Sequence, residues 1–232
     1  MALAITNPYE KANSTSIPAY NAGSGANRIL VVVHVCFNAN PTAISYGGQA
    51  MTLSDSQLDS DSWGKTFIWY LLDPPSGSNS FVITGGATAR EPFFACVLTG
   101  ADTTAVGNKA KSLGNSTTAS VSLSAAEADS LIIYGVSSGT NTAISASGAG
   151  NSLVNEITNS NGEGAMLSRP STGTGAQTIQ ATTPNDFWTI VGQEFLAADT
   201  TAIKTVDGLA KASVKTINGL AIASVKSIDG LT

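Results

Sequence analysis

RILVVVHVCF, residues 28–37, is the stretch that decides the fold. Its apolar part is interrupted by His34 and is far shorter than the roughly 18–20 apolar residues that span a bilayer. Its β-branched residues favour a strand. Because side chains alternate along a strand, His34 is predicted on the second face as an ordinary polar residue. The predicted core face carries Val31, Val33, Val35 and Phe37.

Further short β-branched and aromatic runs follow, each ended by Gly, Asn, Asp, Ser or Pro. SYGGQA at residues 45–50 predicts a hairpin, because glycine supplies the positive φ of a tight turn. DPP at residues 73–75 must end a strand at Leu72, since proline donates no ladder hydrogen bond. Strands are predicted at about 28–37, 43–46, 49–53, 65–72, 79–84, 92–99, 117–123, 130–137, 153–158, 164–168, 176–182 and 187–196.

These short strands, without crossover helices, predict an all-β fold. The expected architecture is an antiparallel β-sandwich of the jelly-roll or immunoglobulin-like type. Further core residues are expected at Phe67, Trp69, Leu71 and Ile133. The expected organisation is an extended N-terminal arm at 1–27, with no regular element, a sandwich domain at 28–198 and C-terminal repeats at 199–232.

Composition narrows the possible partners. A net charge of −5 lacks the basic footprint that binds phosphates, so we expect no nucleic-acid partner. No apolar run approaches the length of a membrane span, so we expect no membrane partner. The N-terminus MALAITNPYEK lacks the pattern of a secretory signal, so the chain is expected to stay in the cytoplasm of the cell that makes it. Cys36 and Cys96 lie inside apolar runs and are expected to be free thiols.

The C-terminal residues repeat with a period of eleven. IKTVDGL, VKTINGL and VKSIDGL begin at residues 203, 214 and 225. Each Asp-Gly or Asn-Gly pair predicts a short β-hairpin. The turn glycines are Gly208, Gly219 and Gly230, and the apolar interface positions are Ile203, Val206, Leu209, Val214, Ile217, Leu220, Val225, Ile228 and Leu231.

Such thin hairpins cannot bury their apolar residues alone, so the repeats need a partner surface. Three partners are compatible with the sequence: the chain's own sandwich, symmetry mates, or another protein. We favour a homotrimer, because identical repeats can stack around a common axis and close their sheet edges.

Candidate chemistry is sparse. His34 is the single histidine, and no nucleophile or ligand spacing accompanies it, so we expect no catalytic residue, cofactor or metal site. Asp55, Asp59 and Asp61 do not follow an EF-hand order and are read as a solvated loop rather than a calcium site. Trp63, in a Ser/Asp/Gly loop, is the best candidate for an exposed ligand contact, for example with a sugar. Trp69 and Trp188 are assigned to strands and to the core.

Several motifs resemble known proteins. NRILVVVHV, ISYGGQAMTL, FIWYLLDPPSG and FFACVLTGAD are similar to a β-sandwich module of phage virion proteins and some bacterial surface proteins, over about residues 28–196. The tail resembles the IK-x-[IV]-[ND]-G-[LV] repeats at the C-termini of many phage structural proteins. The resemblance implies a virion structural role with no catalytic residues: a capsid decoration protein, a head fibre or a tail-associated protein.

The sequence therefore predicts a non-enzymatic particle protein at the virion surface that binds itself and other virion proteins. Two alternatives remain. One is a carbohydrate-binding module for host glycans. The other is an extracellular filament subunit, in which the N-terminal arm or the tail donates a strand to its neighbour.

Overall fold

The computed structural model divides the chain into two compact units, Ala2–Ala198 and Asp199–Thr232 with Met1. We call the first unit the body and the second the tail. The structure describes residues 3–12, 14–15, 17–37, 40–58, 64–86, 91–140, 142–159 and 162–198 of the body, and residues 205–206, 209–210, 216–217 and 220–221 of the tail.

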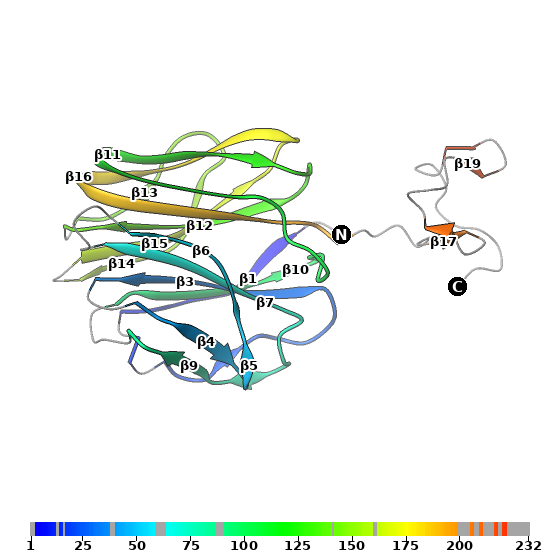
Figure 1. The fold of residues 1–232 in the computed structure, drawn as a ribbon, viewed down its shortest axis with the longest axis horizontal. Coiled ribbons are helices and arrows are strands. Elements are labelled where there is room, and N and C mark those ends of the chain that lie inside the picture. The colour runs from blue at the N-terminus through cyan, green and yellow to red at the C-terminus, as the bar shows by residue number, and fades with distance from the viewer. Residues whose placement is uncertain are drawn as a thin grey trace. The chain divides into compact units, whose positions relative to one another are not determined.

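The described residues form antiparallel strands and no helix, so the predicted all-β class is confirmed. None of them forms a helix that is long and apolar enough to cross a membrane. Figure 1 shows the body as stacked layers of strands.

Two large sheets make up most of the body. The five-stranded sheet has the order β1 (Ala4–Lys11), β10 (Phe93–Thr99), β3 (Arg28–Cys36), β7 (Lys65–Leu72) and β6 (Thr52–Leu58). The six-stranded sheet has the order β11 (Lys109–Ala125), β16 (Gly175–Phe195), β12 (Leu131–Ser138), β15 (Gly162–Pro170) and β14 (Ser152–Asn159), and β13 (Ser145–Ala146) also pairs with β16.

Two small sheets lie beside them. One joins β5 (Gln49–Ala50), β4 (Ala43–Tyr46) and β9 (Phe81–Thr84), and the other joins β2 (Tyr20–Asn21) to β8 (Ser78–Asn79).

The first core cluster lies between the two large sheets. The predicted face of β3 is confirmed, because Val31, Val33, Val35 and Phe37 pack with Ile133 of β12. The sheets approach closely at Gly135, where a Cβ atom would lie 2.5 Å from Val33 Cγ1. Burial of apolar area at about 25 cal/mol per Å² is the main force that holds such layers together.

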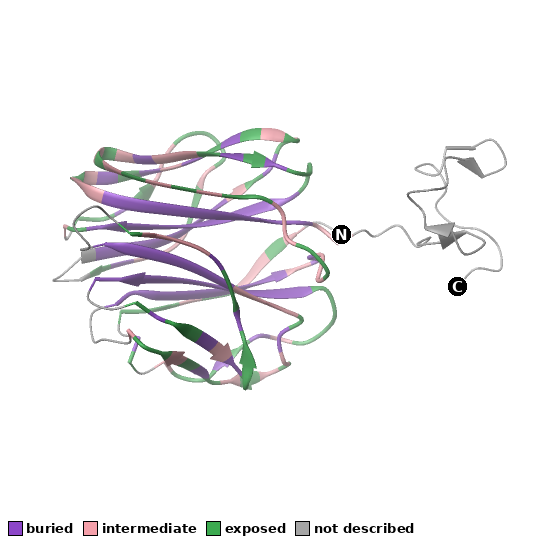
Figure 2. Cartoon of the chain, viewed as in Figure 1, coloured by how far each residue is buried: buried purple, intermediate pink, exposed green. Residues whose placement is uncertain are grey.

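The second face of β3 is buried as well. Leu30, Val32 and Cys36 pack with Tyr46 of β4 and Phe81 of β9, so the small three-stranded sheet covers this side. Every residue of β3 is therefore buried (Figure 2). The predicted core residues Phe67 and Trp69 belong to this cluster, with Leu71 packed against it.

The six-stranded sheet folds over itself through the 21-residue strand β16. Residues 188–195 of β16 pair with β12, whereas residues 175–182 pair only with β11 and β13. Ile179, in the first part, packs in a third cluster with Ile132 and Tyr134 of β12. One long strand thus contributes to two layers.

The predicted turns are confirmed. Ser45 pairs with Ala50 and Tyr46 with Gln49, while Gly47 and Gly48 have φ of 56° and 81°, as the tight turn requires. β7 ends at Leu72, immediately before the Asp73-Pro74-Pro75 segment.

Two predictions were wrong. The region before residue 28 contains β1, an edge strand paired with β10, because main-chain pairing tolerates the local bulge between Thr6 and Tyr9. β16 continues through Thr183-Pro184-Asn185, which the sequence predicts as a break. This segment lies where the register with β11 shifts, and proline is accepted at bulges.

Candidate functional site

The tail contains two described strand pairs. β17 (Thr205–Val206) pairs with β18 (Leu209–Ala210), and β19 (Thr216–Ile217) pairs with β20 (Leu220–Ala221). Val206 pairs with Leu209, and Ile217 pairs with Leu220, in the main-chain register. The other predicted tail positions lie outside the described residues: Ile203, Gly208, Val214, Gly219, Val225, Ile228, Gly230 and Leu231.

The sequence has three tryptophans, of which the structure describes Trp69 and Trp188. Trp69 and Trp188 are 4% and 6% exposed and belong to core clusters, as the sequence predicts. Trp63 lies outside the described residues. The tryptophans that the structure describes therefore offer no exposed platform for a sugar.

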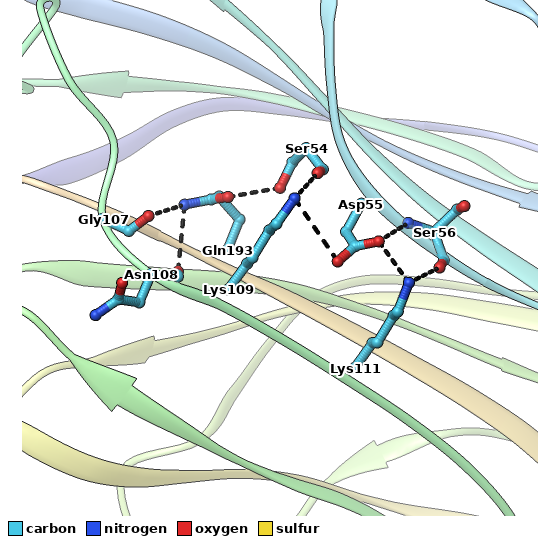
Figure 3. Close-up of polar contacts among 8 residues, drawn as sticks. All are labelled: Ser54, Asp55, Ser56, Gly107, Asn108, Lys109, Lys111 and Gln193. Atoms are coloured by element: carbon cyan, nitrogen blue, oxygen red, sulfur yellow. Dashed lines mark hydrogen bonds and ion pairs between the residues drawn. The ribbon is translucent and has the colours of Figure 1, made fainter.

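Asp55, the described member of the predicted acidic loop, belongs to a polar contact between the two large sheets (Figure 3). Lys111 Nζ lies 2.7 Å from Asp55 Oδ1, and Lys109 Nζ lies 3.8 Å from Asp55 Oδ2. Burial alone would raise the pKa of Asp55, but hydrogen bonds from Lys111 and the Ser56 amide, with the charges of both lysines, hold it below its usual value. Asp59 and Asp61 lie outside the described residues.

Backbone and amide groups extend this contact. Lys109 also donates to the carbonyl of Ser54, whose hydroxyl donates to Gln193 Oε1 of β16 at 2.5 Å. The contact joins the edge strands β6 and β11, so it closes one side of the body. The ammonium groups of Lys109 and Lys111 already pair with the Asp55 carboxylate. Asp55 therefore has a structural role, linking the two large sheets.

Strands at the opposite side of the body also meet, because β1 of one large sheet contacts β14 of the other. Both large sheets therefore have edge strands that lie against a neighbour. Edge strands that lie against a neighbour are less open to pairing with another chain than free edges are.

A buried group of three chemically reactive side chains lies at the end of β3. His34 and Cys36 point to the same face, because they are two residues apart on one strand. Glu91 comes from the segment before β10, which hydrogen-bonds alongside β3 through the Val35 amide and the Pro92 carbonyl. One ligand atom from each of His34, Cys36 and Glu91 lies within 4.8 Å of the others, and all three residues are buried.

The contacts within this group are polar. His34 Nε2 lies 3.6 Å from Glu91 Oε2, which also accepts a hydrogen bond of 3.2 Å from Ser14 Oγ. The rings of His34 and Phe93 also lie in an edge-to-face arrangement, with their centroids 5.8 Å apart. Neither ring nitrogen of His34 makes a hydrogen bond to the described residues.

Cys36 lies between the acid and a buried lysine. In register, Cys36 pairs with Lys65 of β7, which is 8% exposed. Burial raises the pKa of the Cys36 thiol well above its usual value, Glu91 raises it further, and Lys65 opposes the shift. Cys96 lies in the other core cluster, and both cysteines are free, as predicted.

Sequence reasoning placed His34 on the correct face but did not find its partners. The spacing His-Val-Cys on a strand was the available signal, since it puts two ligand atoms on one face. Glu91 is distant in the chain, and only the pairing of β3 with β10 brings it to this place.

Comparison with protein families, with curated proteins and with solved structures gives no match to this chain.

Proposed function

We propose that this chain is a non-enzymatic structural component of a bacteriophage particle, located at the virion surface, which acts by assembly. Its body is a β-sandwich of the jelly-roll or immunoglobulin-like type, and its tail oligomerises or docks. A homotrimer is the favoured assembly, and other virion proteins are the further partners. Capsid decoration, a head fibre and a tail-associated role are the three forms of this proposal.

One observation carries the proposal: three repeats of eleven residues, with lysine, glycine and leucine in register, follow the body as a separate unit. A short hairpin has too little apolar area to be stable alone, so the repeats gain stability by packing against copies or a partner. In two of these repeats the structure pairs the main chains of apolar residues, Val206 with Leu209 and Ile217 with Leu220.

The strands of the body are less suited to assembly than the tail is. The edge strands of both large sheets contact neighbouring strands, so assembly by edge pairing is disfavoured there. β1 is already paired with β10 in its own sheet, so donation of this strand to a neighbour would first require its release. These features favour the tail as the assembly element over an N-terminal strand exchange.

The chemistry of the body agrees with a non-enzymatic role. His34 is the single histidine of the sequence and is fully buried, so it cannot reach a substrate at the surface as an acid or base. The glycan-binding alternative depends on Trp63, and binding to a glycan panel that is lost in Trp63→Ala would support it.

The test is the mass in solution of the full chain and of a 1–201 truncation, measured by light scattering after size exclusion. We expect a trimer that becomes a folded monomer on truncation. A length-matched variant, Leu209→Asp with Leu220→Asp and Leu231→Asp, should also be monomeric, because it replaces the apolar residue after each turn glycine by a charged one. A truncation that keeps both the oligomer and the attachment to particles would refute the role of the repeats.

A further inference from the structure

We propose that His34, Cys36 and Glu91 bind one divalent transition-metal ion, with zinc as the preferred metal. The proposal rests on the geometry of the body and does not depend on the proposed virion role.

The ligand set matches zinc chemistry. Zinc binds imidazole nitrogen, thiolate sulfur and carboxylate oxygen, at bond lengths of about 2.0–2.3 Å. Two ligand atoms on a tetrahedral zinc ion are therefore about 3.5 Å apart. His34 Nε2 and Glu91 Oε2 are 3.6 Å apart, and the full set of three ligand atoms lies within 4.8 Å.

The second observation is the state of His34. It is fully buried, and neither ring nitrogen makes a hydrogen bond to the described residues, although Nε2 points toward Glu91. A buried polar group without a hydrogen bond costs free energy. Coordination of one ring nitrogen to zinc removes this cost at that atom.

Charge also favours a divalent cation. A zinc ion with the thiolate of Cys36 and the carboxylate of Glu91 is a neutral group, which a buried site tolerates better than a net charge. The nearby Lys65 is the group that opposes a cation, since its ammonium is buried beside Cys36. We therefore expect that Lys65→Met binds zinc more tightly than the wild-type chain.

The surroundings supply an outer layer for the metal. Ser14 donates a hydrogen bond to Glu91 Oε2 at 3.2 Å, which orients the carboxylate. Ligands from β3 and from the segment before β10 would be tied together by the ion. Three protein ligands leave the fourth position of a tetrahedral zinc ion to a water molecule. Because all three ligand residues are buried, the metal is expected to bind during folding.

The first experiment uses the full chain under reducing conditions, unfolded with a chelator and refolded with one equivalent of cobalt, which replaces zinc and gives visible absorption. We expect a thiolate-to-cobalt charge-transfer band and the visible bands of four-coordinate cobalt, both removed when zinc is added. Refolded wild-type chain without a charge-transfer band would overturn the proposal.

Cys96→Ser is the matched control, because Cys96 is equally buried but belongs to the other core cluster. The charge-transfer band should persist in Cys96→Ser and disappear in Cys36→Ser. His34→Gln should weaken zinc binding more than the roughly 10–100-fold loss typical of an outer-layer group. Equal bands in Cys36→Ser and wild type would overturn the assignment.

A second measurement covers the case in which the ligand variants do not fold. X-ray absorption at the zinc edge of the refolded wild-type chain should show one sulfur neighbour together with nitrogen and oxygen neighbours. A shell of nitrogen and oxygen alone would mean that Cys36 is not a ligand, and it would overturn the site as proposed.

Discussion

Glu194 offers the sharpest test of how the body is held together. This residue of β16 is fully buried, and its carboxyl oxygens accept hydrogen bonds from the turn between β11 and β12. The donors of this turn are the Ala126 amide at 2.9 Å, the Glu127 amide at 3.3 Å and the Ser130 hydroxyl at 2.6 Å. The Asn108 amide, immediately before β11, donates a further bond of 3.0 Å.

Glu194→Ala removes the acceptor of all four donors. A hydrogen bond to a charged group contributes about 1.5–3 kcal/mol, and a donor left without a partner costs about 1–3 kcal/mol. The four bonds share one carboxyl group and three of them are only partly buried, so their contributions do not add fully. We expect a loss of about 3–5 kcal/mol in the free energy of unfolding, near the largest values seen for single substitutions.

The assay is denaturant unfolding of the 1–201 chain, with Glu127→Ala as the control. Glu127 is exposed and keeps its backbone amide in the variant, so its substitution should change stability by less than about 0.5 kcal/mol. Glu194→Gln should fall between the two, because its amide keeps one acceptor oxygen. If Glu194→Ala unfolds within 1 kcal/mol of the control, the carboxyl group does not hold this turn.

Two further predictions concern packing and pH. Gly135→Ala should destabilise the body by about 1–3 kcal/mol, because the new Cβ would lie 2.5 Å from Val33 Cγ1 and 2.7 Å from Thr66 Cγ2 across the two large sheets. Gly173→Ala, where a Cβ meets nothing within 4 Å, is the control, and equal denaturation midpoints would contradict the packing argument. Burial, with a neighbouring carboxyl, raises the pKa of Glu163 from 4.5 to about 9, so the folded chain retains a proton that the unfolded chain releases. The contribution of this group to the free energy of unfolding is full below pH 4.5 and declines as the pH rises to about 9. In Glu163→Gln, the free energy of unfolding should therefore depend less on pH in this window. An unchanged slope of unfolding free energy against pH would show that Glu163 does not titrate there.

Local patterns predicted the elements whose signals are local. RILVVVHVCF is rich in β-branched residues, which favour a strand, and the predicted face of Val31, Val33 and Val35 packs between the large sheets. The glycine pair at 47–48 determines a turn by its φ, which few other residues adopt at low cost. The assignment of Trp69 and Trp188 to the core followed from the same reasoning and is confirmed.

Local patterns failed where pairing partners decide the structure. β1 contains Pro8 and carries few apolar residues, yet it forms an edge strand because β10 supplies its hydrogen bonds. β16 passes through Pro184 because the register shift with β11 accommodates it. The neighbouring strand supplies the hydrogen bonds that stabilise a strand, and the sequence of one segment does not specify which strand that neighbour is.

The candidate metal site follows the same division. The sequence by itself determined that the chain is all-β and that His34 lies on the opposite face of its strand from the core valines, because these properties depend on composition and on an alternation with period two. Only the tertiary structure decided that this face is buried under a second small sheet and that Glu91 meets His34 there. The reason is that such contacts depend on how distant strands pair and stack.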